Sequence, residues 1–172
     1  MGLVFLAGCR NSDEDVAHVT MDFSTIPVIE QRGAVYTFSD SAAKVLSIEA
    51  GHVLDYAKKE PPYLLFKDGV VFRFFNEGQP TKSYLRADSA RNEKETDLWI
   101  MGGNVAMVNA SGERMETPLL HWDRKENRVW SDTLVTVISD GQIITGTGFE
   151  SNREMQTYRI FNVQGEITVD DE

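Results

Sequence analysis

The sequence predicts an all-β domain built from stacked antiparallel hairpins. Short runs of β-branched, aromatic and other apolar residues alternate with Gly-, Asn- and Asp-containing turn signals, at intervals of about 8–12 residues. A pattern with a period of about 30 residues, the length of two strands and two turns, also recurs in the second half of the chain. Both features are typical of an all-β sandwich or barrel.

The strand-forming runs follow a polar N-terminal region. The folded part is expected to start at residues 28–38, and residues 39–56 are expected to be strand because Gly51 interrupts a helical pattern. The further runs are residues 63–66, 70–75, 98–101, 105–108, 134–138, 143–144 and 158–163. The expected reversals are Lys67-Asp68-Gly69, Asn76-Glu77-Gly78, Asn109-Ala110-Ser111-Gly112, Ser139-Asp140-Gly141 and Gln164-Gly165, where glycine accepts positive φ at little cost.

The internal repeat consists of a short motif, a polar turn and an apolar strand. Ala87-Asp88-Ser89-Ala90 precedes Leu98-Trp99-Ile100, and Thr117-Pro118-Leu119-Leu120 precedes Val129-Trp130. A third unit runs from residue 148 to Tyr158-Arg159-Ile160. One hairpin layer cannot bury its apolar face alone, so we expect the stacked layers to bury one continuous apolar face.

The composition is that of a globular protein with an acidic balance. The chain of 172 residues carries 17 Lys+Arg against 27 Asp+Glu, a formal charge of −10, and the acids concentrate in residues 10–30 and 150–172. This length suits one domain. The charge argues against a nucleic-acid partner, because such proteins normally present a basic patch to phosphate.

The first nine residues, MGLVFLAGC, contain a short apolar run followed by small residues and the single cysteine. Leu6-Ala7-Gly8-Cys9 resembles the lipobox of bacterial lipoproteins, which implies acylation of Cys9 and cleavage before it. No basic residue precedes the run, which is shorter than a usual signal, so we expect a longer signal upstream. The expected division is a truncated signal at residues 1–9, a polar tether at 10–30 and a β-domain at 31–172.

Several motifs occur in an order that resembles one protein family. They are Glu60-Pro61-Pro62 leading to Gly69, Ala87-Asp88-Ser89-Ala90, Gly103-Asn104-Val105, Glu116-Thr117-Pro118, Ser131-Asp132 with Val135, and Thr145-Gly146 with Gly148-Phe149. Together they resemble the lipopolysaccharide-export protein family LptC and its OstA-like relatives over residues 30–168.

The resemblance implies a twisted open β-jellyroll with an apolar interior and no catalytic activity. Such proteins accept lipopolysaccharide from an inner-membrane ABC transporter and pass it to an LptA-like bridge protein of similar fold. The N-terminal strand near residues 35–38 is expected to face the transporter, and residues 158–167 are expected to pair with the bridge protein by strand addition. LptC proteins typically carry a transmembrane helix, whereas this chain shows a lipobox, so we expect a periplasmic protein lipid-anchored to the inner membrane.

Strand periodicity selects candidate lipid-binding side chains. Alternate residues of a strand share one face, which pairs Leu98 with Ile100 and Val105 with Met107. An apolar trough would hold acyl chains by burying apolar area. The expected lipid-binding residues are Leu98, Ile100, Val105, Met107, Leu120, Val135, Val137, Ile143, Phe149, Tyr158 and Ile160.

Other functions stay open from the residues alone. The same apolar residues also suit the closed core of a β-sandwich lipoprotein with a structural or carbohydrate-binding role, in which Trp99, Trp122 and Trp130 would stack on sugars. An exported bridge-like protein without a membrane anchor is a further alternative. No phosphate-binding loop, nucleophile elbow or cysteine pair for zinc occurs, so we expect no catalytic residues, no metal and no cofactor.

Overall fold

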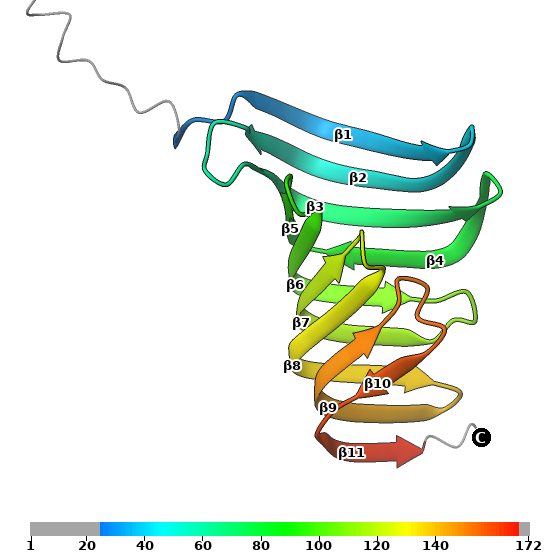
Figure 1. The fold of residues 1–172 in the computed structure, drawn as a ribbon. Helices are drawn as coiled ribbons and strands as arrows, with labels where there is room; N and C mark the ends of the chain where they lie inside the picture. Colours follow the sequence, from blue (N-terminus) through cyan, green and yellow to red (C-terminus); the bar gives the residue numbers. More distant parts are fainter. Residues whose placement is uncertain (1–24, 169–172) are drawn as a thin grey trace, which may run out of the picture.

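The computed structural model describes residues 25–168 as one continuous antiparallel sheet (Figure 1). The strands follow one another as a meander in which most sequential neighbours pair. Their bounds are β1 Ile29–Asp40, β2 Ala43–Tyr56, β3 Tyr63–Asn76, β4 Gln79–Ala87, β5 Ser89–Glu93, β6 Leu98–Val108, β7 Arg114–Asp123, β8 Arg128–Ser139, β9 Gln142–Ser151, β10 Tyr158–Ile160 and β11 Val163–Thr168. The all-β jellyroll of stacked antiparallel hairpins expected from the sequence is confirmed.

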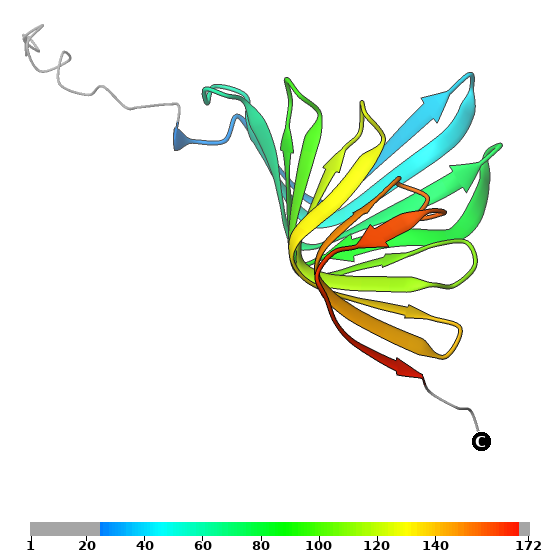
Figure 2. The ribbon, with the colours of Figure 1, turned by 60° about the horizontal axis from the view of Figure 1, so that its bottom comes forward.

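The sheet is folded along a line that crosses the middle of the strands. Figure 2 shows the hairpins diverging from this bend line in two directions, so that the molecule has the shape of an open V. We call the two sides wing A and wing B. Wing A contains the paired segments 52–56, 63–67, 89–93, 98–102, 119–123, 128–131, 149–151 and 158–160, and wing B contains 43–50, 70–76, 79–87, 105–108, 114–117, 134–139, 142–147 and 163–168.

Most interior strands therefore cross the bend and contribute to both wings. The pairing register shifts where they cross, between Gly102 and Val105 in β6 and between Ser131 and Leu134 in β8. Where no single strand crosses the bend, two short strands take its place, one in each wing. β4 and β5 both pair with β3 and β6, and β10 and β11 both pair with β9.

The bend in β3 corrects one expectation from the sequence. Asp68-Gly69 was expected to reverse the chain, but the chain continues through these residues, which have φ values of +60° and +86°. The runs at 63–66 and 70–75 are accordingly two halves of one strand. Residues with positive φ serve a bend as well as a reversal, because both require backbone that twists away from the extended conformation.

Hydrogen bonds continue across the bend line. The Gly69 amide donates to the Asp88 carbonyl (3.0 Å), and the Asp88 amide donates to the Gly103 carbonyl (2.9 Å). The Asn104 side chain then donates to the Asp88 carboxylate at 2.8 Å. The motifs Ala87-Asp88-Ser89-Ala90 and Gly103-Asn104-Val105 are thus neighbouring parts of one bend.

The other expected reversals divide into two groups. Asn76-Glu77-Gly78, the segment 109–112 and Ser139-Asp140-Gly141 connect consecutive strands as hairpin turns, as expected. Gln164-Gly165 instead lies inside β11 at a register shift. Most of the segment 39–56 is strand, as expected, because residues 43–56 form β2. Residues 39–40 instead end β1, and Ser41-Ala42 form the turn between the two strands, with φ values of +48° and +66°.

The repeat predicted from the sequence corresponds to the hairpins of wing A. Its units are β5–β6, β7–β8 and β9–β10, which lie side by side in the sheet.

β1 begins at Ile29, inside the segment expected to be a tether. Residues 1–9 and most of that tether lie outside the described residues, so the division of the N-terminal region stays a prediction.

The close approach of backbones at the bend gives a stability prediction. A Cβ at Gly146 in β9 would lie 2.6 Å from the Phe161 carbonyl oxygen and 2.7 Å from Ile160 Cγ2, whereas a Cβ at Gly165 would meet nothing within 4 Å. Gly146→Ala should lower the free energy of unfolding by about 1–3 kcal/mol, the usual cost of overpacking. The control Gly165→Ala should change it by less than about 0.5 kcal/mol. Urea denaturation measures both, and equal effects would contradict this account of the bend.

Candidate functional site

The apolar interior lies between the two wings and is filled by side chains from both. Wing A contributes Trp99 and Trp122, which are cross-strand neighbours with ring centroids 6.5 Å apart. Phe72 of wing B meets both indoles edge-on, at 5.0 Å from Trp99 and 5.9 Å from Trp122. Phe74 also meets Trp122 edge-on, at 6.0 Å. These contacts hold the wings together, because edge-to-face packing adds to the stabilisation from apolar burial.

Eight of the eleven side chains expected to bind lipid belong to this interior. Val105, Met107, Leu120, Val135, Val137 and Phe149 are fully buried in its cluster of apolar residues, and Tyr158 and Ile160 pack against that cluster. The structure thus brings residues from five strands to one surface. Whether they contact lipid remains a prediction.

Leu98, Ile100 and Ile143 do not lie on the interior face. In β6 the buried positions are Trp99 and Met101, so Leu98 and Ile100 point to the opposite side of the sheet. Their expected grouping with Val105 was wrong because the two-residue alternation continues through the bend. A strict two-residue step back from Val105 reaches Met101 and Trp99.

Strand pairing shows that Ile143 also lies on the outer face of the sheet. Residues directly opposite each other in neighbouring strands share a face. The buried Val137 is opposite Ile144, whereas Ile143 is opposite the exposed Ile138. Large wing B residues of the interior, such as Phe72, were not among the expected lipid-binding residues, although their alternating pattern in the sequence is a signal for them.

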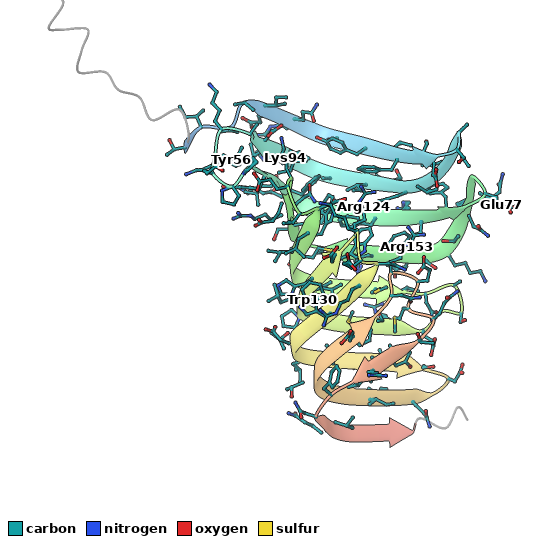
Figure 3. All side chains as sticks on the ribbon, in the orientation of Figure 1. Tyr56, Glu77, Lys94, Arg124, Trp130 and Arg153 are labelled. Carbon is teal, nitrogen blue, oxygen red and sulfur yellow. The ribbon has the colours of Figure 1, made fainter. Side chains whose placement is uncertain are left out.

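The outer face of wing A carries the third tryptophan. Trp130 stacks on His121 with centroids 5.1 Å apart, and the Arg128 guanidinium lies over its ring at 4.9 Å. Figure 3 shows Trp130 nearer the bend than Arg124 and Arg153 at the hairpin tips. By contrast, Trp99 and Trp122 are only 3% and 1% exposed. Sugar stacking on all three tryptophans, the alternative left open by the sequence, is therefore not supported.

The mouth of the V contains a cluster of hydrogen bonds around Glu113. Ser139 Oγ donates to Glu113 Oε1 at 2.6 Å, Asn109 Nδ2 donates to Oε2 at 2.6 Å, and the Tyr158 hydroxyl donates to Oε1 at 3.3 Å. The bond from Ser139, followed by those from Asn109 and Tyr158, holds the pKa of Glu113 below its usual value against the effect of burial. Burial and then the Glu113 charge raise the pKa of Tyr158. Glu113 therefore stays ionised and ties β10 to wing B.

A cavity of about 500 Å³ opens beside this cluster. Its lining combines the apolar side chains of Val45, Phe74 and Phe75 with polar residues, including Asn109 and Gln156. Phe74 also packs against the interior cluster. The cavity therefore connects solvent with the edge of the apolar interior.

The two edges of the sheet carry exposed apolar residues. β1 forms one edge and presents Ile29 and Val35, while Phe161 and Val163 are exposed at the edge formed by β10 and β11. Exposed strand edges offer unpaired backbone groups to a further strand.

Across residues 25–168, no helix is long and apolar enough to span a membrane, and no three His, Cys, Asp or Glu side chains are placed to hold a metal ion.

Comparison with known proteins agrees with this architecture. The chain matches the family model described as "Lipopolysaccharide-assembly, LptC-related" over residues 46–168. A search of curated proteins found no match. Members of this family are non-enzymatic components of lipopolysaccharide transport that face the periplasm at the inner membrane. The match spans most of the chain and includes the bend, both wings and the mouth, and the chain therefore belongs to the LptC family of lipopolysaccharide-assembly proteins.

Proposed function

We propose that the chain holds the acyl chains of lipopolysaccharide between wing A and wing B and passes the lipid along the sheet to a bridge protein. The observation that carries this proposal is the apolar interior, which continues from β2 to β10 and is lined by both wings. Burial of acyl chains there would stabilise the complex by about 25 cal/mol for each Å² of apolar area removed from water.

Lipid binding in this interior requires the wings to separate. Phe72, Trp99 and Trp122 occupy the space between them, so acyl chains must replace these cross-wing contacts. Apolar contacts are non-directional, and acyl chains can substitute for them at low cost in free energy. A closed carbohydrate-binding sandwich would keep the same core but needs exposed aromatic rings, which the buried Trp99 and Trp122 do not provide.

The two sheet edges suggest separate partners. We place the inner-membrane ABC transporter subunits at the β1 edge and the LptA-like bridge protein at the β10–β11 edge. Val35 is 65% exposed on β1, and Val163 is 57% exposed on β11. Strand addition at each edge would extend the sheet through main-chain hydrogen bonds and cover these side chains.

The anchor is proposed from the sequence alone, since Cys9 lies outside the described residues. Acylation at Cys9 would tether the domain to the periplasmic side of the inner membrane. The residues that follow, up to β1, would set its distance from the transporter. Each buried methylene of an acyl chain contributes about 0.8 kcal/mol to membrane binding.

Site-specific photo-crosslinking tests the lipid-binding interior. Photoreactive residues placed singly at Val135, Tyr158 and Ile160 should form adducts with added lipopolysaccharide, because these positions face the interior or its rim. The matched control is Leu134, the neighbour of Val135 on β8, which is 50% exposed on the opposite face, whereas Val135 is 0% exposed. Adducts at Leu134 equal to those at Val135, in a folded protein, would contradict the proposal.

The same chemistry tests the assignment of the edges. A photoreactive residue at Val35 should crosslink to transporter subunits in cells, and one at Val163 should crosslink to the bridge protein. Ile138, exposed on the outer face of wing B, is a control that should capture neither partner. An exchange of the two partners between Val35 and Val163 would reverse the proposed direction of transfer.

Membrane fractionation tests the anchor. Cys9→Ser, expressed from the chromosomal locus, should move the protein from the membrane fraction to the soluble periplasmic fraction, because the thiol that carries the acyl chains is absent. Ser12→Ala, three residues further on, is the matched control and should stay with the membrane. Retention of both variants in the membrane would indicate a different anchor.

A further inference from the structure

Residues 152–157, which connect β9 to β10 and which we call the strap, lie across the mouth of the V. Met155 in the strap is fully buried and belongs to the apolar cluster of the interior. Its φ is +51°, an uncommon value for a residue other than glycine. Loop side chains normally remain at the surface. The strap therefore inserts an apolar side chain into the space that acyl chains would occupy.

The strap is held to wing A by hydrogen bonds that do not involve wing B. The Arg153 amide donates to Asn127 Oδ1, in the neighbouring β7–β8 turn, at 3.3 Å. Within the strap, the Met155 amide donates to the Asn152 carbonyl at 3.1 Å, and the Gln156 amide donates to Asn152 Oδ1 at 3.2 Å. These bonds fix the shape of the strap and its attachment to the hairpins of wing A.

A second set of bonds connects the strap and β10 to wing B. Asn109 Nδ2 donates to the Met155 carbonyl at 3.1 Å, and the same amide donates to Glu113. Tyr158, the first residue of β10, donates to the Glu113 carboxylate, which Ser139 at the end of β8 also contacts. Glu113 thus joins three hairpins across the mouth.

The cavity of about 500 Å³ lies against the same contacts. Arg153, Glu154 and Gln156 of the strap form one side of it, and Phe74 and Phe75 of wing B lie on another. A lipid that approaches the interior through this cavity would meet the strap before it met the buried cluster.

We propose that the strap and Glu113 form a latch that controls access of lipid to the interior. Release of Tyr158 from Glu113, and of the Met155 carbonyl from the Asn109 amide that Glu113 orients, frees the strap to move with wing A. This movement withdraws Met155 from the interior and joins the cavity to it. Opening then occurs beside β10 and β11, the edge at which the bridge protein is proposed to bind. The nature of the lipid rests on the proposed function, whereas the latch itself does not.

Hydrogen–deuterium exchange on the full chain without lipid tests the latch directly. Glu113→Ala should raise exchange in residues 152–160 by about tenfold, because it removes an ionised acceptor of three hydrogen bonds. Tyr158→Phe should raise exchange in the same residues by a smaller factor, because it removes one of these hydrogen bonds. This variant keeps the ring that stacks on Phe149 with centroids 5.9 Å apart, so the β9–β10 hairpin remains packed. Exchange in β1 to β4 should not change in either variant.

Glu116→Ala is the matched control. Glu116 lies in β7, three residues after Glu113, and forms an ion pair with Arg114 rather than with the strap. Glu116→Ala changes the net charge by the same amount as Glu113→Ala. It should leave hydrogen–deuterium exchange in residues 152–160 unchanged. Unchanged exchange in both latch variants, or an equal rise in the control, would overturn the proposal.

The rate of lipopolysaccharide capture, followed by photo-crosslinking at Ile160, links the latch to lipid access. Both latch variants should form adducts faster than the parent chain. Faster exchange without faster capture would overturn the role of the latch in access. If exchange rises as expected but neither the parent nor any variant binds lipopolysaccharide, the latch stands and the proposed lipid function fails.

Discussion

The bend line is the constraint on which the rest of the structure depends. At Gly51 a Cβ would lie 2.5 Å from the Asp68 carbonyl oxygen, and at Gly103 it would lie 2.5 Å from an Asp88 carboxylate oxygen. The bend therefore leaves no room for a side chain at either glycine, because the Asp68 backbone lies against Gly51 and the Asp88 side chain lies against Gly103. Because the hydrogen-bond ladder continues through Asp88, the two wings remain parts of one sheet rather than two packed sheets.

This continuity determines how the interior is built. A strand such as β6 places Trp99 and Met101 in wing A and Val105 and Met107 in wing B, so one strand lines both walls. Because the pairing register shifts at the bend, a hinge motion there would leave the pairing within each wing in place. The contacts that resist hinging are therefore those that cross the space between the wings, namely the aromatic contacts of Phe72 and the bonds around Glu113.

The sequence predicted most strands, several hairpin turns and the repeat, because each depends on local patterns, but no run was assigned to β4. It could not distinguish a bend from a reversal at Asp68-Gly69, since both use residues with positive φ. Leu98 and Ile100 were assigned to the wrong face because residues 98–101 and 105–108 were treated as separate runs, whereas β6 continues through both. The cluster around Glu113 was not predictable, because Asn109, Ser139 and Tyr158 meet through the fold and no spacing in the sequence indicates it.

The packing between the wings also bears on how readily they separate. The indole N–H of Trp122 is buried and has no hydrogen-bond partner among the described residues. An unpaired buried donor costs about 1–3 kcal/mol, so the closed interior is less stable than its apolar area alone would indicate. Separation of the wings would expose this donor to water or to a lipid carbonyl, and the recovered hydrogen bond would offset part of the lost contacts with Phe72 and Phe74. The closed state is held by replaceable apolar contacts and by the latch at the mouth, and it is weakened by the unpaired Trp122 donor. Contacts of this kind would allow the proposed acyl chains to replace the interior side chains as the wings separate.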